Sequence, residues 1–155
     1  MGECVKKIIA SESAMLALGG TLAKYLDKTA VIFLKGPLGA GKTTFARGLL
    51  RAQGVTGSVK SPTYSLVETY SLPDKTIHHF DLYRLNNAEA LFEWGIEDYF
   101  SDAAICLIEW PEQGEKALPI PDIIFDFQCI AESRLVLGKA MTSLGQTILQ
   151  QLNDE

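Results

Sequence analysis

The feature that most constrains this chain is a glycine-rich segment that directly follows an apolar run. Residues 30–35 read AVIFLK, and this β-branched and aromatic composition predicts a buried strand. Residues 36–43 read GPLGAGKT and match the pattern G-x-x-x-x-G-K-[ST] at every fixed position. Helix-favouring residues follow, with Phe45, Leu49 and Leu50 on one face. The chain therefore contains the strand, loop and helix that this pattern requires as its context.

The spacing of the motif has a chemical reason. Glycines let backbone N–H groups turn towards phosphate oxygens, and the helix N-terminus behind them adds partial positive charge. Lys42 can reach the β- and γ-phosphates, and the hydroxyl of Thr43 can ligate Mg²⁺. A glycine-rich turn without a ligand is the alternative interpretation. The strand before the motif and the helix after it favour a nucleotide phosphate site.

Length and composition predict one soluble domain over residues 1–155. Hydrophobic residues make up 47% and charged residues 21%, and the longest apolar runs are much shorter than a membrane span. The first residues lack the apolar core of a signal peptide, so we expect a cytoplasmic protein. Cys4, Cys106 and Cys129 follow no metal-ligand spacing, and we expect reduced, mostly buried thiols.

The charge balance limits the partners of the chain. The sequence holds 14 Lys and Arg against 19 Asp and Glu, a net charge of −5, and shows no basic stripe. Proteins that bind nucleic acid directly usually neutralise its phosphates with such a stripe. Any role in RNA chemistry would therefore have to run through other proteins.

The remaining elements follow from periodicity, caps and breakers. Ser11 is expected to cap a helix over residues 12–26, in which Gly19 and Gly20 suggest close packing. The helix after the glycine-rich motif should end near Gly54. The other predictions are strands at 5–10, 65–71, 76–82, 103–110, 123–129 and 133–137, a helix opened by Asn86 or Asn87 and ended by Gly95, a helical turn at 96–100, a loop at 111–121, and a closing helix at 141–152.

A polar loop over residues 57–64 follows the motif helix and carries Ser61 and Thr63. Hydroxyls placed there can close over the γ-phosphate and its metal, although they could equally serve only as turn-forming residues. His78 and His79 are neighbours on the next predicted strand. Their side chains should point to opposite faces, so we do not expect them to share one ion.

Two acids stand at the ends of predicted strands. Asp81 closes a half-apolar strand, and Glu109 closes the apolar run at 103–110. An acid at the carboxyl end of a strand beside the motif strand can hold the Mg²⁺ shell or orient the attacking water. A strand-end acid that merely faces water is the alternative for Glu109. Arg134 could stack on a purine or be an ordinary surface arginine.

Four sequence blocks together resemble the TsaE (YjeE) family of bacterial ATPases, which are needed to make threonylcarbamoyladenosine in tRNA. The blocks are GPLGAGKTTFARG, KSPTYSLVETY, HHFDLYRL and LIEWPEQG, in this order. The resemblance implies a single three-layer α/β P-loop domain with a mixed, largely parallel central sheet and a C-terminal hairpin plus helix. It also implies ATP or ADP with Mg²⁺, and action through the TsaB and TsaD proteins, with tRNA involved only indirectly.

The resemblance also implies roles for individual residues. Lys42 would contact the phosphates, Thr43 and Glu109 would surround Mg²⁺, and Asp81 would belong to the catalytic and metal shell. Thr63, with Ser61, matches a switch-like loop, and Trp110 matches a tryptophan beside the nucleotide. Positions implied to contact nucleotide are Ser11, Gly36, Gly39, Ala40, Gly41, Lys42, Thr43, Thr44 and Arg134. Pro37 departs from the family, which often has an acid directly after the first glycine.

Three functional classes other than a partner-dependent ATPase could use a motif of this kind. A small-molecule kinase usually needs several arginines around the transferred phosphate, whereas this chain has four in all and no arginine-rich lid. A GTPase would need an N-K-x-D segment, and none occurs. A nucleotide-gated binding module without hydrolysis stays open, because only the surroundings of Asp81 and Glu109 argue for chemistry. No arginine finger is evident, so turnover by the chain alone should be slow.

Overall fold

The computed structural model describes residues 3–101 and 103–155. Its strands are β1 (Cys4–Ile9), β2 (Ala30–Lys35), β3 (Val67–Ser71), β4 (Thr76–Asp81), β5 (Ile105–Glu109), β6 (Ile123–Ile130) and β7 (Ser133–Ala140). Its helices are α1 (Glu12–Ala23), α2 (Lys42–Gln53), α3 (Glu89–Trp94), α4 (Glu97–Ser101) and α5 (Ser143–Asn153), with short 3₁₀ turns η1 (Pro111–Gln113) and η2 (Glu115–Ala117).

All seven strands form one sheet in the order β1-β7-β6-β2-β5-β4-β3. The central strands β6, β2, β5 and β4 are mutually parallel, whereas β1 with β7, β7 with β6, and β3 with β4 pair antiparallel. Strands β2 and β5 are apolar almost throughout, as expected for parallel strands covered on both faces. The predicted mixed, largely parallel α/β fold with a C-terminal hairpin and helix is confirmed.

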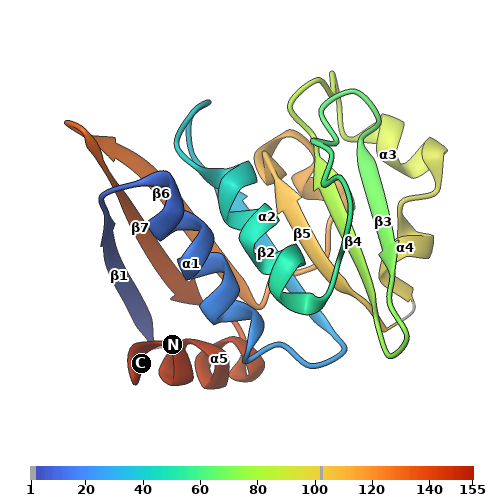
Figure 1. Ribbon diagram of the computed structural model, residues 1–155. Helices are drawn as coiled ribbons and strands as arrows, with labels where there is room; N and C mark the ends of the chain where they lie inside the picture. Colours follow the sequence, from blue (N-terminus) through green and yellow to red (C-terminus); the bar gives the residue numbers. More distant parts are fainter. Residues whose placement is uncertain (1–2, 102) are drawn as a thin grey trace.

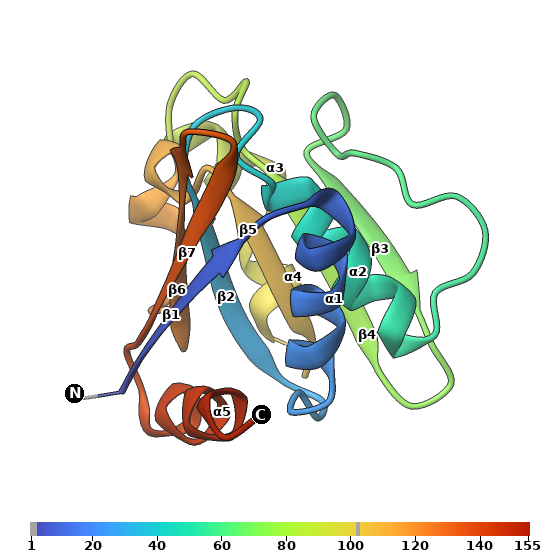
Figure 2. The ribbon, with the colours of Figure 1, turned by 60° about the vertical axis from the view of Figure 1, so that its left-hand side comes forward.

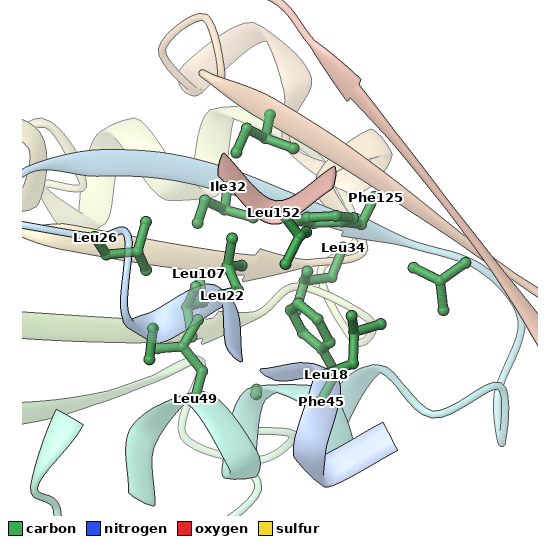
Figure 3. Close-up of a cluster of buried hydrophobic side chains, with 14 of the residues drawn as sticks. Leu18, Leu22, Leu26, Ile32, Leu34, Phe45, Leu49, Leu107, Phe125 and Leu152 are labelled. Atoms are coloured by element: carbon green, nitrogen blue, oxygen red, sulfur yellow. The ribbon is translucent and has the colours of Figure 1, made fainter. Parts of the chain in front are cut away.

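Helices cover both faces of the sheet (Figure 1). Helices α1 and α2 lie side by side on one face, and α5 lies across the lower end of β1 and β7 (Figure 2). The main core forms between these three helices and the sheet, where Phe45 and Leu49 of α2 meet Ile32 and Leu34 of β2 (Figure 3). A second cluster on the opposite face packs α3 and α4 against β4 and β5, with Phe80 at its centre.

Two glycines allow α1 and α2 to approach each other closely. A β-carbon on Gly19 would meet the carbonyl oxygen of Phe45, and a β-carbon on Gly48 would meet the carbonyl oxygen of Leu16. Both obstacles are backbone atoms, which no rotamer change can move. Close packing at Gly19, expected from the sequence, is therefore present, and it fixes α2 and the loop before it against α1.

Most differences from the predicted elements are shifts of their ends. Helix α1 ends at Ala23 although Leu26 is still buried, because the chain leaves the helix while its apolar residues continue into the core. Helix α3 begins only at Glu89, and the side chain of Asn87 accepts a hydrogen bond from the backbone N–H of Ala90. Strand β7 extends to Ala140, because β1 and β6 pair with it along its length.

The prediction for the cysteines was partly wrong. Cys106 is buried in β5, but Cys4 and Cys129 are exposed, and all three are free thiols. Cys4 begins the edge strand β1, and Cys129 lies near the turn that joins β6 to β7. Within residues 3–101 and 103–155, no helix combines the length and apolar character that crossing a membrane requires.

Candidate functional site

The loop between β2 and α2 forms a backbone cradle at the carboxyl edge of the sheet. Gly36, Gly39 and Gly41 have φ angles of 143°, 78° and 107°, a region that side-chain-bearing residues rarely adopt. A β-carbon on Gly36 would also meet the carbonyl oxygen of Phe127. No side chain caps α2, so the N–H groups of its first turn stay available to an anion. The geometry fits a chain of phosphate groups.

Lys42 is the first residue of α2, and its side chain is only 4% exposed. Its ammonium group donates a hydrogen bond to the carbonyl oxygen of Gly36 and lies 3.6 Å from the centroid of the Trp110 ring. Burial lowers the pKa of Lys42, and the negative charges of Glu109, Glu112 and Asp81 oppose that shift. The lysine therefore lies inside the cradle beside Trp110, for which the family resemblance implies a place next to the nucleotide.

Asp81 and Glu109 lie side by side because β4 and β5 are parallel and end in register. Asp81 is the last residue of β4, Glu109 is the last residue of β5, and the two are paired positions. Both are buried. The Thr43 hydroxyl donates to Glu109 at 3.0 Å from Oε1 and 3.1 Å from Oε2. The parallel register thus assembles one hydroxyl and two carboxylates next to Lys42.

The loop that carries Ser61 and Thr63 reaches the same edge of the sheet. The Thr63 hydroxyl donates to Oδ2 of Asp81 at 3.0 Å and lies 2.7 Å from the Ser61 hydroxyl. The other oxygen of Asp81 accepts from the backbone N–H of Tyr83. These contacts join the loop to a carboxylate of the site through one side-chain hydrogen bond.

Two cavities flank the cradle and share Gly39, Gly41 and Thr44 in their walls. The second, of about 230 Å³, is also lined by Thr43 and by the cluster of Lys42, Thr63, Asp81, Glu109 and Trp110. The first, of about 190 Å³, is lined by Ser11 and Arg134 together with residues not predicted from the sequence, namely Ile9, Ala10, Glu12, Met15 and Glu132. The second cavity therefore contains the hydroxyls of Thr43 and Thr63 and the two strand-end carboxylates. The first cavity lies between α1 and the β6–β7 hairpin.

The two predicted residues of the first cavity are held by local contacts. Ser11 is the N-cap of α1, as expected, and its hydroxyl accepts from the N–H of Ala14 at 3.1 Å. Arg134 donates through Nε to the carbonyl oxygen of Gly39 at 3.3 Å. The hairpin thereby contacts the glycine-rich loop, although the two segments are 95 positions apart in the chain.

Ala40 differs from the other positions implied to contact nucleotide. Its side chain is fully buried in the main core, and its N–H donates to the carbonyl oxygen of Pro37 at 3.3 Å. Only the backbone of Ala40 can take part in the cradle. Pro37 lies in the loop itself, where its carbonyl group helps to form the turn.

The donor set fits a magnesium ion held together with phosphate oxygens. Thr43, Glu109 and Asp81 supply hard oxygen ligands, and Mg²⁺ typically takes one or two carboxylates, substrate phosphates and water. In the part of the chain that the structure describes, no group of three or more His, Cys, Asp or Glu could hold a metal ion on its own. This arrangement suits Mg²⁺ that arrives with a nucleotide better than a dedicated protein cage.

Sequence reasoning missed one residue of this cluster. His79 is completely buried, and its Nε2 lies 2.7 Å from Oε2 of Glu109. His78 faces the other side of the sheet, where its Nδ1 lies 2.8 Å from the Thr69 hydroxyl and its ring contacts Tyr99. The signal that could have found His79 is its position two residues before Asp81, on the same face of the strand.

The fold and the loop between β2 and α2 place this chain in the class of P-loop α/β proteins. A crystal structure described as Bacillus subtilis YdiB matches with a TM-score of 0.85 over 99% of this chain and 97% of that one, at 24% identity. This likeness supports the fold.

The sequence comparisons define the family within this class. A family model described as "Threonylcarbamoyl adenosine biosynthesis protein TsaE" matches residues 9–136. A Haemophilus influenzae protein named "tRNA threonylcarbamoyladenosine biosynthesis protein TsaE" is 43% identical over 157 aligned residues, covering 98% of this chain and 99% of that one. A Rickettsia bellii protein of the same name is 35% identical over 82% of this chain and 88% of its own length. The chain belongs to the TsaE family, as the four sequence blocks predicted.

Proposed function

We propose that this protein is a magnesium-dependent ATPase that supports threonylcarbamoyladenosine modification of tRNA through a TsaB–TsaD complex. One observation carries the chemical part of this proposal. A glycine cradle, a buried lysine, a helix-start hydroxyl and two buried carboxylates converge at one edge of a parallel sheet. The modification pathway comes from the names of the TsaE relatives.

Binding of the triphosphate would rest on the cradle. The free N–H groups at the start of α2 would donate to phosphate oxygens, and Lys42 would leave the carbonyl oxygen of Gly36 for the β- and γ-phosphates. The base would extend into the first cavity, between Ser11 and Arg134. There the planar guanidinium of Arg134 can stack on a purine.

The two carboxylates have different neighbours, and this suggests different roles. Glu109 binds the hydroxyl of Thr43, so it belongs beside the metal-ligating threonine. Asp81 instead accepts a hydrogen bond from Thr63 of the switch-like loop, and we assign it the role of accepting a proton from the attacking water. Bound Mg²⁺ would neutralise charge on the β- and γ-phosphates. Water oxygen would attack the γ-phosphorus as the bond to the β–γ bridging oxygen breaks.

We expect slow ATP hydrolysis by the protein alone because of the residues that line the second cavity. The described residues that line this cavity include no arginine, and Arg84 instead lies 4.3 Å from the Tyr64 ring. An arginine at the transferring phosphoryl group commonly gives a large rate acceleration in such enzymes. A partner protein would therefore raise the rate, and hydrolysis would reset the partner complex through a shift of the loop around Thr63.

The decisive experiment measures ATP hydrolysis by the purified protein with Mg²⁺, alone and with a TsaB–TsaD complex. We expect slow turnover alone and a clear increase with the complex, and calorimetry should detect ATP binding in both cases. Equal rates would contradict the partner dependence. Binding without any turnover in either mixture would favour the nucleotide-gated binding module, and a lack of ATP binding would overturn the whole proposal.

A further inference from the structure

His79 is a polar side chain that the proposed phosphate chemistry does not use directly. It belongs to β4, is fully buried, and precedes Asp81 by two residues on the same face of the strand. Its Nε2 atom lies 2.7 Å from Oε2 of Glu109 on the neighbouring strand. Burying an imidazole is costly unless it makes a specific interaction, and this hydrogen bond is the one that its ring makes.

The other ring nitrogen identifies the tautomer. Nδ1 of His79 is buried and has no hydrogen-bond partner among the residues that the structure describes. A proton on Nδ1 would leave a buried donor unsatisfied, so the ring carries its proton on Nε2. Nε2–H therefore donates its hydrogen bond to Oε2 of Glu109.

The carboxylate of Glu109 is fixed from two directions. The Thr43 hydroxyl approaches both of its oxygens from α2, and His79 donates to Oε2 from β4. Thr43 alone does not fix the group, because its hydroxyl is nearly equidistant from Oε1 and Oε2. His79 contacts only Oε2, so it distinguishes the two oxygens. Oε2 is held towards β4, and Oε1 remains available to Thr43 and the metal shell.

We propose that His79 is a positioning residue of the ATPase, which fixes the carboxylate of Glu109 so that it can support Thr43 and the metal shell. The inference rests on the proposed function. His79 touches neither nucleotide nor metal in this scheme and acts through Glu109. Partners of this kind, behind a metal-binding group, commonly change metal affinity or activity by about ten- to hundred-fold.

The test compares three substitutions at one position. Glutamine carries its amide N–H about as far from the backbone as Nε2 of histidine, asparagine keeps the amide but is too short, and leucine removes the donor. We expect His79→Leu and His79→Asn to lower kcat by about ten- to hundred-fold and to raise the Mg²⁺ concentration for half-maximal rate. The KM for ATP should change little, because the cradle and Lys42 remain. His79→Gln should restore most of the activity.

A double-mutant cycle separates positioning from a general structural role. If His79 acts through Glu109, His79→Leu should change kcat by less than about twofold once Glu109→Gln is present. The matched control is His78→Gln, a neighbour on the opposite face of the same strand, which should keep kcat within about twofold of wild type. Thermal unfolding of each variant checks that it folds, and if His79→Leu does not, the Gln and Asn pair answers the question.

The outcomes distinguish this inference from the proposed function. Wild-type protein that fails to bind or hydrolyse ATP would overturn the proposed function and the inference with it. Wild-type turnover together with equal rates for the Gln, Asn and Leu variants would overturn the inference alone. Independent, multiplicative effects of His79→Leu and Glu109→Gln on kcat would do the same.

Discussion

Because α1 and α2 are in close contact, we expect alanine substitutions at two neighbouring glycines of α1 to change stability in opposite directions. Gly19 and Gly20 both lie within α1, where alanine is favoured over glycine by about 1 kcal/mol. A β-carbon at position 20 would lie 3.7 Å from the β-carbon of Ala52, an ordinary contact. At position 19 it would meet the carbonyl oxygen of Phe45 and lie 2.9 Å from the backbone nitrogen of Leu49.

These distances set the expected magnitudes. Gly20→Ala should raise the free energy of unfolding by up to about 1 kcal/mol, because alanine has the higher helix propensity. Gly19→Ala gains the same helix propensity but overpacks a backbone contact, which typically costs about 1–3 kcal/mol, and the upper end applies because no side chain can move aside. The two variants should therefore differ by about 3 kcal/mol, or roughly 6–12 °C in Tm for a domain of this size.

Urea denaturation followed by circular dichroism, with thermal melts of the same samples, measures this difference directly. Both variants replace hydrogen with one methyl group in the same helix, so each is the control for the other. If Gly19→Ala were as stable as Gly20→Ala, or more so, the close approach of α1 to α2 would not limit the packing. The reasoning that α1 holds α2 and the preceding loop in place would then be refuted.

Two further predictions concern the proposed nucleotide site and the thiols. Lys42→Ala should abolish ATP hydrolysis and support of tRNA modification together, because the cradle loses its cation; modification that persists in this variant would contradict an energy-coupling role. Ellman's reagent at pH 8 should label Cys4 and Cys129 in the native protein and Cys106 only after unfolding. Burial raises the pKa of Cys106 from 9.0 to about 12, so the folded state favours the neutral thiol. The buried neutral thiol should therefore stabilise the fold fully below pH 9, and this stabilisation should be lost between about pH 9 and 12. Over that range the free energy of unfolding of the wild-type protein should fall more steeply than that of Cys106→Val, which has no thiol to ionise.

Much of the site could be predicted because it depends on local sequence. The glycine-rich loop, Lys42 and Thr43 form one continuous segment, and Asp81 and Glu109 were recognisable as acids that end apolar strands. Parallel strands bring their carboxyl ends to one edge, so the closeness of these two acids needed only the fold class. Glu109 proved to be buried and hydrogen-bonded, which removes the alternative of a strand-end acid facing water.

The parts that could not be predicted depend on register between distant segments. The hydrogen bond from His79 to Glu109 requires the exact alignment of β4 with β5, which no local pattern encodes. Trp110 reaches Lys42 because its backbone is left-handed, with φ of 57°, directly after β5 ends. The sequence near Trp110 gives no sign of this turn. Helix ends also shifted: α1 stops at Ala23 while the buried Leu26 continues the apolar pattern, so that pattern alone does not mark the end of a helix.

The pairing of β1 with β7 also has a consequence for biosynthesis. The first cavity takes one wall from residues 9–15 and the other from Glu132 and Arg134, so the two walls are made more than a hundred residues apart. On the ribosome, β1 stays unpaired until β7, more than a hundred residues later, has emerged. A nascent chain can thus form its glycine-rich loop early, but it completes the first cavity only after β7 has been synthesised.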